Sequence, residues 1–155
     1  MRSRERIRCL LFAAGLACVP ASTTAAPLDI PSVEFQPGRP RQGETLEQSL
    51  MPARAGRPTE LENLQRAALL LQTHKPARFE VAGHADKGEC AEPAQCDALS
   101  QRRAQLVLGY LIDHGIDARR LLGLTGYGAE RPIVTDPRPG QDRSLNRRVE
   151  FNEDV

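Results

Sequence analysis

The chain has 155 residues, a formal net charge of +1 and 40% hydrophobic residues. This length and hydrophobic content can build one core but not two, so we expect a single folded domain. No stretch is apolar over the roughly 20 residues that a membrane-spanning helix needs, which argues against a transmembrane protein.

The first 25 residues predict an export signal. Three arginines precede an apolar stretch from about Ile7 to Val19, a fourth, Arg8, lies at its start, and small residues follow up to Ala25. This is the order of a secretory signal peptide. Cleavage after Ala25 leaves 17 basic and 19 acidic residues, a net charge of −2, so no basic field remains for nucleic acid. The sequence GLAC that ends at Cys18 partly matches a lipoprotein processing site, but Gly15 stands where a large aliphatic residue is expected. We therefore expect a periplasmic protein, with an outer-membrane lipoprotein anchored at Cys18 as the alternative.

Residues 26–58 are rich in Pro, Gly and Arg. One short apolar alternation, Ile30, Val33 and Phe35, predicts a first strand near residues 30–35. The remainder of this segment has the composition of a long loop or a mobile stretch. We expect the main folded domain to span residues 59–155.

Helices and strands alternate after residue 58. Thr59 and Glu62 form a capping box ahead of an apolar pattern with helical spacing, and Gly115 is typical of a left-handed helix stop. The expected elements are a helix at 60–73, a strand at 79–83, a helix from about Asp97 to His114, a strand at 122–127 and a strand at 147–152. With the first strand, this order predicts an α+β fold, β-α-β-α-β-β, with a mixed sheet and the helices packed on one face.

The exported part keeps two cysteines, Cys90 and Cys96. Their spacing in an exported protein predicts a disulfide that ties the loop between the strand and the second helix. The three histidines, His74, His84 and His114, add too few soft ligands for a metal site. We therefore expect no metal and no cofactor.

Two charged residues flank this loop. Asp86 follows the strand end, where alone it is typical of a turn former that accepts from local backbone donors. Arg103 falls inside the apolar stripe of the helix, so it must extend to water or be held by an anion. Taken together, a carboxylate and a guanidinium form a receptor for a zwitterionic amino-acid head group.

Four motifs carry a resemblance to a known family. They are FEVAGHAD at 79–86, LSQRRAQLVLGYLIDHGI at 99–116, RLLGLTGYGAERPI at 120–133 and NRRVEF at 146–151. In this order they resemble the OmpA-like C-terminal domain family, which includes peptidoglycan-associated lipoproteins and the periplasmic part of flagellar motor stators. The resemblance covers residues 78–152 and implies non-covalent binding of peptidoglycan through the diaminopimelate of its stem peptide.

The resemblance also implies roles for single residues. Asp86 would take the ammonium of diaminopimelate and Arg103 its carboxylate, with Asn146 and Arg147 framing the site. The residues that would form the scaffold of the site are Gly83, His84 and Leu99, with the His84 imidazole bonded to backbone. We expect Arg148 and Glu150 to be solvated charges beside the last strand. The chain departs from the family at Cys96, where an asparagine is usual.

The sequence leaves two alternatives to peptidoglycan binding. An enzyme would use His84 and Asp86, but no nucleophile elbow, HExxH helix or phosphate loop accompanies them, so we expect no catalysis. An envelope adaptor would keep the fold, bind a protein partner through residues 26–58 and carry a vestigial peptidoglycan site.

Overall fold

The computed structural model describes residues 29–74, 78–136, 138 and 141–153. The expected signal segment and Cys18 lie outside these residues. The helices and strands are β1 (Val33–Glu34), α1 (Leu46–Ser49), α2 (Glu60–Thr73), β2 (Phe79–Gly83), α3 (Pro93–Asp113), β3 (Leu121–Gly126) and β4 (Arg148–Glu153), with single 3₁₀ turns η1 (Lys87–Glu89), η2 (Ala118–Arg120) and η3 (Ser144–Asn146).

The four strands form one mixed sheet in the order β1-β4-β2-β3. The central strand β2 pairs parallel with β3 and antiparallel with β4. At the other edge β1 pairs antiparallel with β4 over only two residue pairs. The expected α+β fold with a mixed sheet is confirmed, and the first strand lies within residues 30–35 as predicted.

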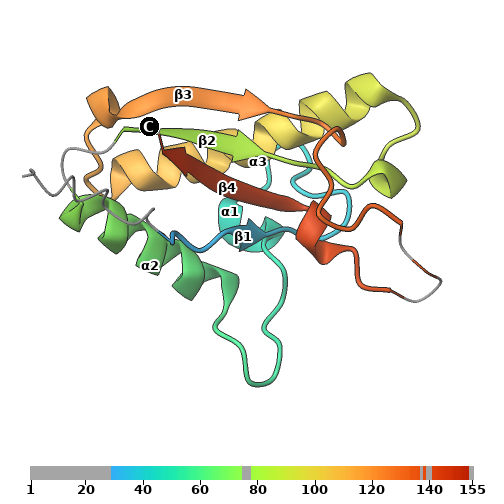
Figure 1. Cartoon of the computed structure of the whole chain (residues 1–155), viewed down its shortest axis with the longest axis horizontal. Coiled ribbons are helices and arrows are strands. Elements are labelled where there is room, and N and C mark those ends of the chain that lie inside the picture. The colour runs from blue at the N-terminus through green and yellow to red at the C-terminus, as the bar shows by residue number, and fades with distance from the viewer. Residues whose placement is uncertain (1–28, 75–77, 137, 139–140, 154–155) are drawn as a thin grey trace, which may run out of the picture.

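The apolar faces of α2 and α3 cover one side of this sheet, and α3 runs behind β2 and β3 in Figure 1. The opposite side of the sheet is polar, since Glu80 on β2 accepts hydrogen bonds from Thr125 and Asn152 on the neighbouring strands. The buried residues that form the main core are Val33, Phe35, Leu46, Leu50, Leu64, Ala68, Leu71, Phe79, Val81, Ala104, Val107, Leu111, Ile116 and Val149.

The sequence predicts the start of α2 correctly but not the start of α3. Thr59 caps α2 through a capping box with Glu62, with bonds of 3.2 and 2.7 Å, so the predicted bounds of this helix are correct. The prediction that α3 starts near Asp97 is wrong, because the helix begins at Pro93. Proline is favoured in the first helical turn because its missing N–H is not needed there. Gly115 has φ +84°, the left-handed helix stop that was expected.

The segment after β1 is a long loop for most of its length, as predicted, but it is packed around one short helix and is not a mobile stretch. Thr45 and Gln48 form a second capping box that starts the short helix α1. Leu46 and Leu50 are each only 6% exposed and belong to the main core. The Pro and Gly content of the segment conceals this helical turn, because the turn spans only four residues.

Two glycines bring the ends of β2 and β3 against α3. A Cβ on Gly83 would lie 2.0 Å from the carbonyl oxygen of Ser100, and a Cβ on Gly126 would lie 2.7 Å from the backbone nitrogen of Gln101. Any side chain at either position would push α3 away from the sheet. This close approach fixes where the loops that follow the strands begin.

Candidate functional site

Polar loops gather at one end of the sheet. The loop after β2 carries η1, the connection after β3 leads to η3, and α3 begins beside them. In Figure 1 these segments lie at the right of the sheet, where the arrows of β2 and β3 end and β4 begins. Loops on a rigid scaffold are the usual carriers of binding residues.

Asp86 lies at the start of η1 and is only 3% exposed. Its Oδ1 accepts from the backbone N–H of Gly88 at 2.7 Å and lies 2.7 Å from Nη2 of Arg143. Its Oδ2 accepts from Nε of Arg143 at 2.9 Å and from Nδ2 of Asn146 at 2.8 Å. Burial alone would raise the pKa of Asp86, but the bonds from Asn146, Gly88 and Arg143 outweigh it and hold the pKa below its usual range.

Arg103 is completely buried inside the apolar stripe of α3. Its five N–H groups all have acceptors. Nε donates to the carbonyl of Arg39, one hydrogen of Nη1 to the carbonyl of His84 and one hydrogen of Nη2 to the carbonyl of Gln36. The other two donate to the carboxylate of Glu89 at 3.0 and 2.7 Å. The anion that an arginine at this position requires is therefore supplied by the chain itself.

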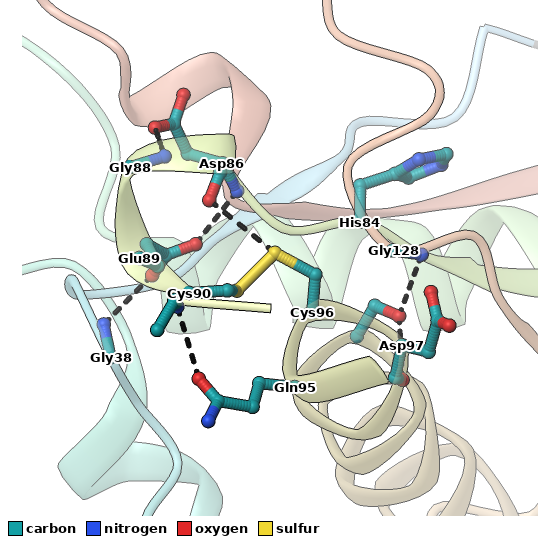
Figure 2. Close-up of a disulfide and its surroundings, with 12 residues drawn as sticks. Gly38, His84, Asp86, Gly88, Glu89, Cys90, Gln95, Cys96, Asp97 and Gly128 are labelled. Atoms are coloured by element: carbon teal, nitrogen blue, oxygen red, sulfur yellow. Dashed lines mark hydrogen bonds between the residues drawn. A yellow bond between two sulfur atoms is a disulfide. The ribbon is translucent and has the colours of Figure 1, made fainter. Parts of the chain in front are cut away.

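Glu89 connects the two predicted site residues, whose side chains have different partners. Besides Arg103, its carboxylate accepts from the backbone N–H groups of Asp86 and Gly38, both at 2.7 Å. Figure 2 shows Glu89 between these two backbone groups. The carboxylate is only 4% exposed, so this pair is a buried, fully hydrogen-bonded ion pair.

The predicted disulfide joins Cys90 and Cys96, whose Cα atoms are 5.5 Å apart. It ties the loop after η1 to the first turn of α3 (Figure 2). Cys96 packs with Ala85 and Leu99 in a small second core, which places the predicted scaffold residue Leu99 directly under the loop. At the position where asparagine is usual, the chain therefore has a covalent link.

A cavity of about 370 Å³ lies beside the disulfide. Its lining includes Lys87 from η1, Asp97 from α3 and Glu130 from the loop after β3. Charges of both signs thus surround an open volume next to the loop that holds Asp86.

Asn146 is 2% exposed and joins two segments of the site. Its Nδ2 donates to Asp86, while its Oδ1 accepts from the backbone N–H groups of Ile133 and Val134, both at 2.8 Å. Arg147 points elsewhere, since its Nε donates to the carbonyl of Phe35 after β1. Among the four residues predicted to form the site, the side-chain hydrogen bond in the structure is the one between Asp86 and Asn146.

His84 is buried, and its surroundings differ from those expected. Its Nε2 lies 3.0 Å from Oε1 of Glu150, and its ring stacks on Tyr127, so the imidazole bonds a carboxylate rather than backbone. Glu150 is in turn paired with Arg148 at 2.8 Å. The prediction that Arg148 is solvated is wrong, because Arg148 is only 5% exposed, whereas the Glu150 side chain is 30% exposed and paired on its inner side. The bond from His84, together with Arg148, lowers the pKa of Glu150 to about 2 despite its burial.

Sequence reasoning missed Glu89 and Arg143. Asp86 and Glu89 form a capping box around η1, and the spacing D-x-x-E is a readable signal of one. Arg143 stands three residues before Asn146 across the turn η3, and residues three apart in a 3₁₀ turn lie on one side. That signal becomes readable only once η3 is known.

Within the described ranges no group of three or more His, Cys, Asp or Glu side chains could hold a metal ion. Likewise, none of the helices in the described part combines the length and the apolar character needed to cross a membrane.

The fold and this cluster define a class of protein, a small α+β binding domain with charged loops gathered at one end of a mixed sheet. The model of the OmpA family matches residues 57–147, more than half of the chain. The chain therefore belongs to the OmpA family. The resemblance seen in the sequence is confirmed.

Two curated proteins match similar shares of the chain. The peptidoglycan-associated lipoprotein of Haemophilus influenzae is 41% identical over 89 residues, which cover 56% of this chain and 54% of that protein. A photosystem I P700 chlorophyll a apoprotein A2 of Gloeobacter violaceus is 35% identical over 93 residues, which cover 57% of this chain but only 10% of that protein. The chain thus spans at most about half the length of these curated relatives. The crystal structure of the peptidoglycan-associated lipoprotein from Burkholderia pseudomallei has the same fold, with a TM-score of 0.59, 20% identity, and coverage of 88% of this chain and 100% of that one.

Proposed function

We propose that this domain binds peptidoglycan non-covalently through the diaminopimelate of the stem peptide and tethers the protein within the bacterial cell envelope. The observation that carries the proposal is the 2.8 Å contact between Asp86 and Asn146, which joins the GHAD and NRR motifs at one end of the sheet. Similarity to a peptidoglycan-associated lipoprotein supports the same ligand class.

The free end of diaminopimelate is an amino-acid head group, with an ammonium and a carboxylate on one carbon. Asp86 offers the carboxylate for the ammonium, and its lowered pKa keeps it ionised at neutral pH. Arg103 and Arg147 are the arginines that the family pattern assigns to the site. Charge-assisted hydrogen bonds are each worth only about 1.5–3 kcal/mol, so affinity for one stem peptide is modest. A polymeric wall compensates, because it offers many equivalent sites near one another.

The proposed location follows from the same reasoning. Residues 1–25 act as the export signal and the protein resides in the periplasm, unless lipidation of Cys18 holds it at the outer membrane. The intact mass of the protein purified from its native envelope distinguishes the two, because cleavage after Ala25 and a lipid on Cys18 give different masses. The ligand-binding part is the domain from residue 59 onward, to which β1 contributes the edge strand.

Co-sedimentation with insoluble peptidoglycan sacculi tests the proposal. The native chain should sediment with sacculi and release no soluble muropeptides, and release would contradict a binding-only role. Asp86→Asn should weaken binding by about tenfold or more, the effect of losing one charge-assisted contact. Asp117→Asn is the matched control, because Asp117 also pairs with an arginine but lies 43% exposed before β3. Equal binding by Asp86→Asn and the control would show that Asp86 is not the contact.

A second candidate is an envelope adaptor that keeps the fold and binds a protein partner through residues 26–58. The observation that favours it is that Asp86 and Arg103 are both fully bonded to the chain's own side chains and backbone. If the protein is an adaptor, the native chain should not sediment with sacculi. Substitutions at exposed positions of residues 26–58 should then abolish binding to the protein partner.

A further inference from the structure

We propose that Arg143, and not Arg103, is the arginine that meets the carboxylate of the bound head group, and that Arg143 leaves Asp86 to do so. This inference rests on the proposed function and names the residue that selects its ligand. In the structure the chain fills its own site. The guanidinium of Arg143 pairs with Asp86 at the position where a ligand ammonium would bind. The carboxylate of Glu89 pairs with Arg103 at the position where a ligand carboxylate would bind.

The two internal pairs differ in how readily a ligand can replace them. Arg103 is 0% and Glu89 4% exposed. Glu89 also accepts from two backbone N–H groups, so displacing it would strand a buried carboxylate. An uncompensated buried charge is strongly unfavourable. The Glu89–Arg103 pair therefore stays in place and positions the loop.

Arg143 is the accessible member of the cluster. Its side chain is 36% exposed. Its Nε and Nη2 bind Asp86, while Nη1 has no acceptor among the described residues. A Cβ on Gly88 would lie 3.3 Å from Nη1 of Arg143 and 3.0 Å from Oδ1 of Asp86. The glycine thus leaves this ion pair uncovered on one side.

Charge balance favours exchange at this pair. When the ligand's ammonium replaces the guanidinium on Asp86, that carboxylate stays paired, and the freed guanidinium takes the ligand's carboxylate. Gly88 and Asn146 keep their bonds to Asp86 and hold its orientation. A zwitterion can therefore enter between Asp86 and Arg143 without leaving either charge unpaired. A ligand with an ammonium alone leaves Arg143 displaced and without an anion.

Two soluble stem peptides test this selection, one with diaminopimelate and one with lysine, which lacks the second carboxylate. Binding of each to the full chain is measured by isothermal titration calorimetry. The native chain should prefer the diaminopimelate peptide by about tenfold or more, the effect of one charge-assisted contact. In Arg143→Gln the two peptides should bind with nearly equal affinity, and the affinity for the lysine peptide should not fall. Arg143→Lys should restore part of the preference for the diaminopimelate peptide. Arg119→Gln is the matched control, because Arg119 is 90% exposed, pairs with Asp117 and lies before β3.

Two results would overturn the inference while leaving peptidoglycan binding intact. One is an unchanged preference in Arg143→Gln. The other is tighter binding by Glu89→Gln, which would mean that Glu89 competes with the ligand for Arg103. If the native chain binds neither peptide, the proposed function and this inference both fail.

Discussion

Removing the Arg103 side chain should destabilise the domain more than any exposed substitution. Arg103→Ala leaves the Glu89 carboxylate buried without its cation and takes a donor from the carbonyls of Gln36, Arg39 and His84. Breaking a buried ion pair from one side costs about 3–5 kcal/mol, and each stranded buried polar group adds about 1–3 kcal/mol where water cannot reach it. We expect a loss of at least about 5 kcal/mol in the free energy of unfolding.

Urea unfolding followed by circular dichroism measures this loss. With a slope of about 1–3 kcal/mol per molar urea for a small domain, the midpoint should fall by about 2 M or more. A variant that is already unfolded without urea would also agree with this prediction, because a marginally stable natural domain has a free energy of unfolding of only about 5 kcal/mol. Arg102→Ala is the matched control. It makes the same change one residue away on the exposed side of α3 and should stay within about 0.5 kcal/mol of the native chain. A midpoint for Arg103→Ala equal to that of this control would refute the reasoning.

Three further changes test other parts of the structure. Gly83→Ala should destabilise the domain by about 3 kcal/mol, because its Cβ would lie 2.0 Å from a carbonyl oxygen of α3. Gly109→Ala is the control and should stabilise the domain slightly, because its Cβ would meet nothing within 4 Å. Equal urea midpoints for the two variants would contradict the close approach. The pKa of Glu150 is lowered to about 2 in the folded chain, so its ionised form stabilises the fold above about pH 4.5. Because solvent screens this half-buried group, the contribution is about 1–2 kcal/mol, and it is lost as the pH falls toward 2. Thermal unfolding of Glu150→Gln should accordingly be less sensitive to pH over that range than that of the native chain, and parallel curves would disprove it. Reduction of the Cys90–Cys96 disulfide, which closes a loop with a separation of six residues, should lower stability by about 2 kcal/mol, and an unchanged urea midpoint after reduction would count against it.

Local signals in the sequence were enough for most of the fold. The Thr59 capping box and the apolar spacing after it locate α2 to the residue, and Gly115 ends α3 as its backbone preference requires. The start of α3 was missed because Asp97 is an equally good capping residue in isolation, while Pro93 sits in a loop-like stretch of the sequence. Local signals of similar strength compete, and only tertiary packing decides between them.

The site was less readable, because its contacts join distant parts of the chain. Asp86 and Asn146 are 60 residues apart, and the family motifs alone placed them together. The partners of Arg103 include carbonyls 64 and 67 residues earlier in the chain, in a segment whose composition suggested a loop. The requirement for an anion beside Arg103 was visible from burial, but periodicity does not say which carboxylate supplies it.

The contacts of Arg103 have a mechanical consequence. A pull on the chain ahead of Val33 would load β1 first, and its ladder with β4 has only two residue pairs. Resistance must then come from the turn just after β1, where the carbonyls of Gln36 and Arg39 are held by Arg103 and a neighbouring N–H by Glu89. Tension from the N-terminal side would thus be borne by Arg103 and Glu89, the side chains that also shape the loop after β2. The same buried ion pair would therefore resist the pull of a tether and support the proposed binding site for the wall.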